Sequence, residues 1–291
     1  MHIRVKIPTK KKVFMCLIAL AIVSVVLVFA LRKEKKTLQY DIVVLGDSVV
    51  GNVGEDGVSF TSYLEEKLNK TVFKGGFGGT TMSLKADLQW GSISSAEWSM
   101  VKLAEAISYD DWKSQKATMA YAQSYKGINY QALHYFEETM DGLCQIDFGE
   151  VEILIIEHGT NDYNNGKILD NPDDLYDVTT FGGALRRSLK LLKKSYPDLR
   201  IVLMSPIYCE FGDAGEQKCY NTKVGNGRYL DEYVALEKEI AQDFEVEWID
   251  AYHGSGIWAE NAEQYIPDGL HLNTDGHKKI ADFLADYLQV D

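Results

Sequence analysis

The stretch Tyr40-Asp-Ile-Val-Val-Leu-Gly-Asp-Ser48 decides the fold of this 291-residue chain. Residues 42–45 form a short, mostly β-branched run that is typical of a buried strand, and Gly46 permits a sharp turn directly after it. Similar short apolar runs recur along the chain, and amphipathic stretches with helical spacing separate them. Strands that alternate with helices predict an α/β domain, in which helices cover both faces of a mainly parallel sheet.

The expected elements follow one another from residue 40 to the end of the chain. Residues 92–148 interrupt the alternation, because their apolar side chains follow a helix-like spacing without a clear strand, so we predict a helical insertion there. Further strands are expected at 71–74, 151–156, 200–205 and 246–250, and helices at 60–68, 181–196, 229–244 and 275–288.

The N-terminal segment differs from the rest in composition. Residues 13–31 form a 19-residue run without charge, with five basic residues before it and four close behind it. At about 1.5 Å per residue such a helix crosses a hydrocarbon core of roughly 30 Å. We therefore expect a cytoplasmic tail at 1–12, a transmembrane signal anchor at 13–31 and a linker at 32–38. A cleavable signal peptide is the alternative, although the run lacks a clear small-x-small site.

This anchor predicts a single-pass protein of the cell membrane, with residues 39–291 as an extracytoplasmic domain. The whole chain has a net charge of −13, and the residues after 36 alone carry 21 basic and 42 acidic side chains. So acidic a domain should repel nucleic acid, which we exclude as a partner. Cys209 and Cys219 lie ten residues apart across a Gly-rich stretch, and they could form a disulfide or remain free thiols.

Gly46-Asp47-Ser48 follows the first strand, where active groups of parallel sheets gather. A serine hydroxyl becomes nucleophilic when a base removes its proton, and its own N–H can point at a developing oxyanion. In Asp268-Gly-Leu-His271 the aspartate can reach back to Nδ1 of the histidine, which leaves Nε2 free to act as that base. Taken alone, each of these short motifs is more often an ordinary turn.

Two further motifs follow later strands. Gly76-Phe-Gly-Gly79 has the small residues that let a backbone N–H approach a substrate, with Gly79 the preferred donor and Gly78 the alternative. In Gly159-Thr-Asn161-Asp162, the Asn161 side chain is a suitable oxyanion donor at a strand end. The neighbouring polar side chains are candidates to face the substrate: Asp47, His158 and Asp162.

The four motifs together, in this order, closely resemble the SGNH hydrolases, also called GDSL-like lipases and acylhydrolases. The resemblance covers roughly residues 40–290 and includes the stretch His271-Leu-Asn-Thr-Asp-Gly-His277. It implies a three-layer flavodoxin-like sandwich, with Ser48 as nucleophile and Asp268 and His271 completing the triad. It also implies an oxyanion hole formed by Ser48, Gly79 and Asn161. The first motif departs from the family's usual Gly-Asp-Ser-Leu, because Val49 stands in the fourth place.

The resemblance implies an esterase that needs neither a metal ion nor another cofactor. We expect a carboxylic ester as substrate, first an acetyl ester of carbohydrate and second a lysophospholipid or other lipid ester. A non-catalytic domain that binds glycan or protein is a further alternative. A metal-dependent phosphoesterase built on Asp47, Asp162 and Asp268 is disfavoured, because the sequence has no clustered histidine ligands.

Overall fold

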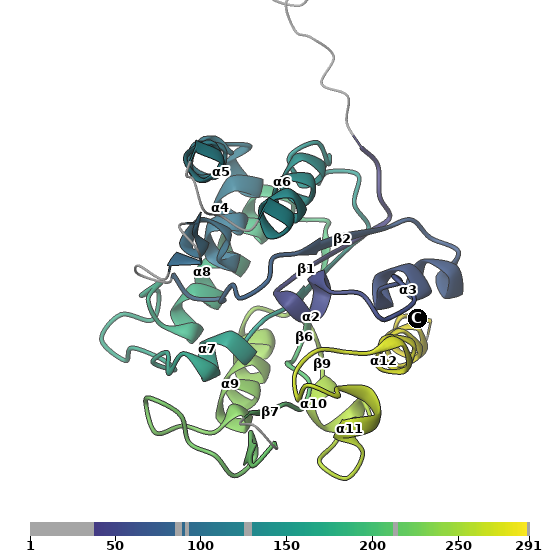
Figure 1. Ribbon diagram of the computed structural model, residues 1–291. Helices are drawn as coiled ribbons and strands as arrows, with labels where there is room; N and C mark the ends of the chain where they lie inside the picture. The colour runs from purple at the N-terminus through teal and green to yellow at the C-terminus, as the bar shows by residue number, and fades with distance from the viewer. Residues whose placement is uncertain (1–37, 85–88, 91–92, 125–129, 212–214, 290–291) are drawn as a thin grey trace, which may run out of the picture. The chain divides into compact units, whose positions relative to one another are not determined.

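A five-stranded parallel sheet forms the centre of the domain in the computed structural model, which describes residues 38–84, 89–90, 93–124, 130–211 and 215–289 (Figure 1). Counted along the chain, the strands lie in the order 2-1-3-4-5, which is the doubly wound order of flavodoxin-like sheets. Each strand lies within two residues of its predicted place. The strands are β1 (Ile42–Gly46), β2 (Val72–Gly76), β5 (Ile153–Glu157), β6 (Arg200–Met204) and β9 (Glu247–Ile249).

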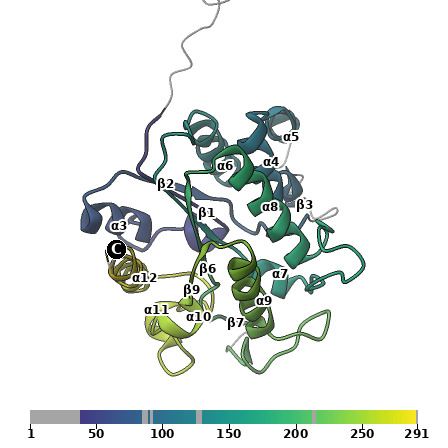
Figure 2. The same ribbon diagram turned by 180° about the vertical axis from the view of Figure 1, so that it is seen from behind.

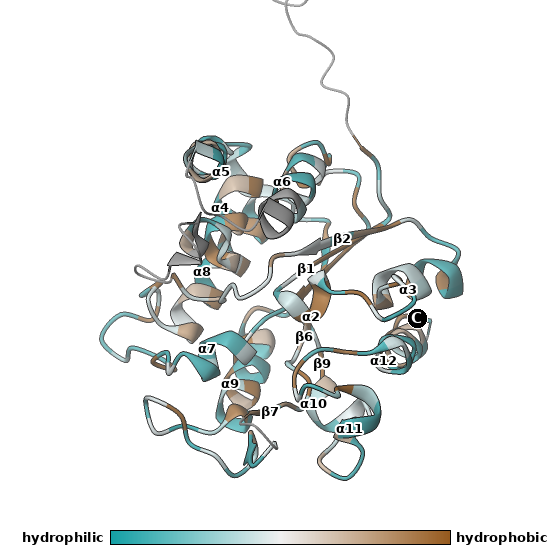
Figure 3. Cartoon of the chain, in the orientation of Figure 1, coloured by the Kyte–Doolittle hydropathy of each residue, from teal (hydrophilic) through white to brown (hydrophobic). Residues whose placement is uncertain are grey.

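The strand β1 lies inside the sheet, where β2 and β5 pair with its two edges. Residues 42–45 are completely buried, which explains why the run is apolar throughout instead of alternating. Figure 3 shows the strands as mostly apolar, whereas helices such as α12 (Thr274–Leu288) carry hydrophilic stretches. The core therefore lies between the sheet and its helices.

Helices cover the two faces of the sheet (Figures 1 and 2). The helix α3 (Phe60–Leu68) packs against α12 (Thr274–Leu288) on one face. On the other face, α8 (Phe181–Ser195) packs against α9 (Leu230–Asp243) and α4 (Met100–Tyr109). The α/β expectation is therefore confirmed.

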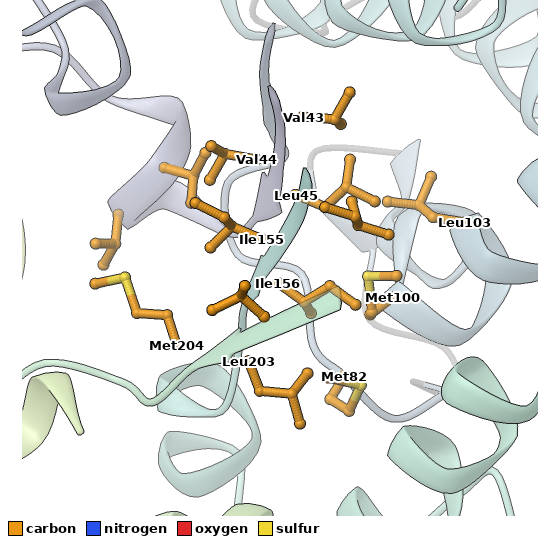
Figure 4. Packing of buried hydrophobic residues seen from close by; sticks show 14 of the residues in the cluster. Val43, Val44, Leu45, Met82, Met100, Leu103, Ile155, Ile156, Leu203 and Met204 are labelled. Carbon is orange, nitrogen blue, oxygen red and sulfur yellow. The ribbon is translucent and has the colours of Figure 1, made fainter. Parts of the chain in front are cut away.

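The segment predicted as a helical insertion holds the short 3₁₀ helix Ser95–Trp98 and the helices α4, α5 (Lys113–Ser124) and α6 (Tyr130–Leu143). Figure 4 shows Met100 and Leu103 of α4 beside side chains of the sheet. This helix is therefore part of the layer that covers the sheet, and α6 contacts β2 nearby.

Several short elements have no counterpart in the sequence prediction, because two to five residues are too few to show a period. Two of these elements, β7 (Glu210–Phe211) and β8 (Gln217–Lys218), form a ribbon. Cys209 and Cys219 lie opposite each other beside this ribbon, and both are free thiols. The short strands are β3 (Gln89–Trp90), β4 (Ile93–Ser94), β7 (Glu210–Phe211) and β8 (Gln217–Lys218), and the short helices are α2 (Ser48–Gly51), α7 (Thr160–Asn164), α10 (Ala251–Gly254) and α11 (Ala262–Tyr265).

The predicted tail at 1–12, the anchor at 13–31 and nearly all of the linker at 32–38 lie outside the described residues. Within the described ranges, no helix has both the length and the apolar character needed to span a membrane. The membrane anchor therefore stays a prediction from the sequence.

Candidate active site

Ser48 is the first residue of α2 and follows β1 after only one intervening residue. This abrupt change from strand to helix depends on Gly46. A Cβ atom there would lie 2.2 Å from Cγ2 of Val50 and 2.8 Å from the carbonyl oxygen of Glu157. The turn leaves Ser48 half-buried at the carboxyl edge of the sheet, where its hydroxyl lines a pocket.

His271 reaches this hydroxyl from the loop between α11 and α12, 223 residues further along the chain. Its Nε2 atom lies 3.0 Å from Oγ of Ser48, and its Nδ1 atom lies 2.7 Å from Oδ2 of Asp268. The other carboxylate oxygen of Asp268 accepts hydrogen bonds from the N–H groups of Leu270 and His271, at 2.9 and 2.7 Å. Although partial burial opposes ionisation of Asp268, these hydrogen bonds lower its pKa below the ordinary value.

The loop that carries His271 is held by the ribbon β7–β8. The N–H of Glu210 donates to the carbonyl of Gly269 at 2.8 Å. Gly269 has a φ of +81°, and a Cβ atom there would lie 2.4 Å from the Glu210 carbonyl oxygen. Only glycine combines this conformation with so close an approach, so the ribbon fixes the backbone between Asp268 and His271.

The glycine loop after β2 lies on another side of Ser48. A Cβ atom on Gly78 would be 3.6 Å from Cβ of Ser48, and Gly79 has a φ of +72°. Asn161, in the first turn of α7, completes the group of predicted oxyanion donors. All three residues line the same pocket as Ser48 and His271.

The pocket has a volume of about 370 Å³, which lies within the range of small-molecule sites. Its other lining residues are Asn52, Leu270, Tyr135 and Phe136. Tyr135 donates a hydrogen bond from its hydroxyl to the carbonyl of Gly76 at 2.5 Å. The sequence did not single out these four residues. Tyr135 and Phe136 look like core residues of a helix, and Asn52 and Leu270 belong to loops without a periodic pattern.

Asp47, the residue before Ser48, is buried and does not line the pocket. Its Oδ1 atom accepts a hydrogen bond from the N–H of Val49 at 2.8 Å, and its Oδ2 atom accepts one from Nδ2 of Asn161, also at 2.8 Å. Burial raises the pKa of this carboxyl to about 6, against the opposing effect of the Val49 hydrogen bond. Asp47 therefore contacts an oxyanion candidate directly.

The other two substrate-side candidates are also completely buried. Asp162 accepts hydrogen bonds from the N–H groups of Met82 and Ser83 and from the Ser83 hydroxyl, at 2.6 to 3.0 Å. It thereby ties the chain after the glycine loop to α7. The ring of His158 has no hydrogen-bond partner among the described residues, and burial lowers its pKa to about 3.

No group of three or more histidine, cysteine, aspartate or glutamate side chains in the described part of the chain could hold a metal ion. A serine, an imidazole and a carboxylate within hydrogen-bond reach of one another have the arrangement that acyl transfer requires.

A family model for GDSL-like lipases and acylhydrolases matches residues 44–279, about four fifths of the chain. The chain belongs to the GDSL-like lipase/acylhydrolase family. This membership confirms the resemblance seen in the sequence, and it makes the protein an ester hydrolase. The matched span contains the residues around Ser48, Gly79, Asn161 and His271.

Solved structures share the fold at low sequence identity. A protein from Lactobacillus plantarum aligns with a TM-score of 0.58 at 22% identity, over 86% of this chain and 97% of its own. A possible lipase from Chitinophaga pinensis gives 0.53 at 19%, over 86% and 98%. Est24, a carbohydrate acetylesterase from Sinorhizobium meliloti, gives 0.50 at 15%, over 86% and 98%. No curated protein matches the chain in sequence.

Proposed function

We propose that this GDSL-family hydrolase cleaves carboxylic esters through an acyl-enzyme on Ser48, with His271 as base and Asp268 as its orienting carboxylate. The observation that carries the proposal is that His271 contacts both other side chains, Ser48 through Nε2 at 3.0 Å and Asp268 through Nδ1 at 2.7 Å. A neutral imidazole that donates from Nδ1 to Asp268 has its Nε2 lone pair directed at the serine hydroxyl.

The reaction proceeds in two steps. In the first, Ser48 Oγ attacks the ester carbonyl while His271 takes its proton, and the imidazolium then protonates the leaving alcohol. In the second, His271 activates a water molecule that releases the acid. In both steps the N–H groups of Ser48 and Gly79 and the Asn161 amide stabilise the oxyanion.

For the substrate we propose a short acyl group, first of all acetyl, on carbohydrate. Phe136 forms part of the pocket wall, and its buried ring packs on Phe77 and Trp98 at centroid distances of 5.3 and 5.5 Å. A wall packed on two aromatic neighbours does not yield readily to a long acyl chain. Est24, which is described as a carbohydrate acetylesterase, has the same fold.

We further propose that residues 13–31 anchor the chain in the cell membrane, with the hydrolase domain on the outer side. The basis is the uncharged 19-residue run and the acidic character of the domain that follows. Acetylated polysaccharide close to the cell surface would then be within its reach.

The experiment compares the full-length protein in detergent with its Ser48→Ala variant on p-nitrophenyl esters from acetyl to long acyl. Ser195→Ala, an exposed serine at the end of α8, is the matched control. We expect hydrolysis of the short esters by the wild type and the control only. Acetylated oligosaccharide and lysophospholipid then separate the two substrate classes, and a preference for lysophospholipid would replace the carbohydrate proposal.

A further inference from the structure

We infer that Asp47 is a positioning residue, whose carboxylate sets the orientation of the Asn161 amide so that an N–H group is directed into the oxyanion hole. This inference rests on the proposed function, since it assigns a role within the same reaction. It concerns the middle residue of Gly46-Asp47-Ser48, which never touches the pocket itself.

The hydrogen bond between the two side chains joins residues that are 114 apart in sequence. An asparagine amide nitrogen carries two hydrogens, so one can donate to Asp47 while the other remains available to a ligand. An ionised carboxylate can only accept hydrogen bonds. Turning the amide over would place its oxygen against the Asp47 carboxylate, and this repulsion keeps the nitrogen on the side of the nucleophile.

The position of Asp47 is itself well determined. Only 1% of the residue is exposed, and its second oxygen is occupied by the N–H of Val49, the residue after the nucleophile. One carboxylate therefore binds both α2, which carries Ser48, and α7, which carries Asn161. It sets the distance between the nucleophile and an oxyanion donor.

The orientation that the Asp47 carboxylate imposes on the Asn161 amide should depend on pH. Burial raises the pKa of Asp47 to about 6, so the carboxyl gains a proton as the pH falls through that value. A protonated carboxyl can donate as well as accept, and the turned-over amide is then tolerated. The titratable groups that face Asp47 from the elements packed around it are His271, Asp162, Glu157, Tyr135 and Cys209.

The first test is Asp47→Asn, which keeps the shape and the oxygen that binds Val49 but replaces the acceptor for Asn161 by a donor. We expect kcat to fall on the order of 100-fold, as for loss of one oxyanion donor, with KM nearly unchanged. The double variant with Asn161→Ala should be no slower than Asn161→Ala alone, because Asp47 acts through that amide.

Asp250→Asn is the matched control, because Asp250 also caps a four-residue helix after a strand, by accepting from the N–H of His253 at 3.0 Å. It should retain the wild-type kcat. Wild-type kcat in Asp47→Asn, or effects of Asp47→Asn and Asn161→Ala that multiply, would overturn the inference. Activity that survives Ser48→Ala would instead overturn the proposed function.

A pH profile tests the inference even if Asp47→Asn does not fold. In the wild type, kcat/KM should fall as the pH drops through about 6, because protonation of Asp47 frees the Asn161 amide. In Asn161→Ala the fall over this range should be less steep, because the amide is absent. Equal steepness in the two proteins would show that Asp47 does not act through Asn161.

Discussion

Replacing Asp47 by asparagine should raise the free energy of unfolding by an amount that increases from pH 5 to pH 8. The carboxyl is buried, and its pKa rises from 3.8 to about 6 on folding. A group whose pKa is higher in the folded state favours folding while it is protonated, and this contribution is lost as the pH rises through the folded-state value. Ionised Asp47 therefore opposes folding at neutral and alkaline pH, and Asp47→Asn removes that penalty.

The size of the effect follows from the two pKa values. A rise from 3.8 to about 6 corresponds to roughly 3 kcal/mol of unfolding free energy at pH 8 and about half of that at pH 5. The hydrogen bond to Asn161 that the variant loses adds a cost of roughly 1 kcal/mol, which we expect to vary little with pH. Relative to the wild type, the unfolding free energy of the variant should therefore increase by roughly 1 to 2 kcal/mol between pH 5 and pH 8.

Thermal unfolding of the full-length proteins at these two pH values measures this gain. For a domain of this size, the difference in Tm between variant and wild type should increase by roughly 3 to 6 °C from pH 5 to pH 8. Ser48→Ala is the control, because it removes a neighbouring side chain without removing a carboxyl. A Tm difference that is the same at both pH values would refute the reasoning that Asp47 titrates near 6 in the folded protein.

Three further predictions concern the reaction. Asn161→Ala should lower kcat by about 100-fold or more, while Tm falls only by the roughly 2 to 4 °C that loss of its hydrogen bond to Asp47 costs. Wild-type kcat in this variant would exclude Asn161 from the oxyanion hole. Phe136→Ala should raise the kcat/KM ratio of butyryl to acetyl ester by on the order of 10-fold, since each buried methylene is worth about 0.8 kcal/mol. The control Tyr135→Phe keeps the aromatic ring and should leave this ratio unchanged. An unchanged ratio in Phe136→Ala would show that Phe136 does not limit the length of the acyl group. Prolonged treatment with a chelator should leave hydrolysis intact, whereas loss of activity that a divalent metal restores would favour a metal-dependent mechanism.

The strands and long helices were predictable from the sequence because their signals are local. The runs at β1 and β5 are mainly apolar, with Glu157 as the charged end of β5, since the sheet is covered on both faces. The helix α12 shows a clear apolar face, with Asn273 as its N-cap. The helices of residues 92–148 were also visible as a pattern. Their packing was not, because nothing in the spacing of α4 shows that it lies along α8.

The site was predictable only in part, because a sequence pattern reports local structure and does not report contacts between distant segments. Motifs such as Gly46-Asp47-Ser48 mark residues of suitable chemistry at strand ends, and parallel strands bring those ends together. The contact of Asp47 with Asn161 and the pocket wall at Phe136 join segments far apart in sequence. Pairings of this kind leave no periodic signal, so only the coordinates show which polar residue faces the pocket and which is buried without lining it.

Chemical labelling of the nucleophile is the most direct test of whether Ser48 reacts with the help of His271. The full-length protein and its His271→Ala variant would be treated with a phosphonofluoridate ester, which reacts covalently with activated serine hydroxyls, and the modified peptide would be identified by mass spectrometry. We predict a single adduct on Ser48 in the wild type and a greatly slowed reaction in the variant. An adduct on another residue, or equal labelling of Ser48 without His271, would contradict this prediction.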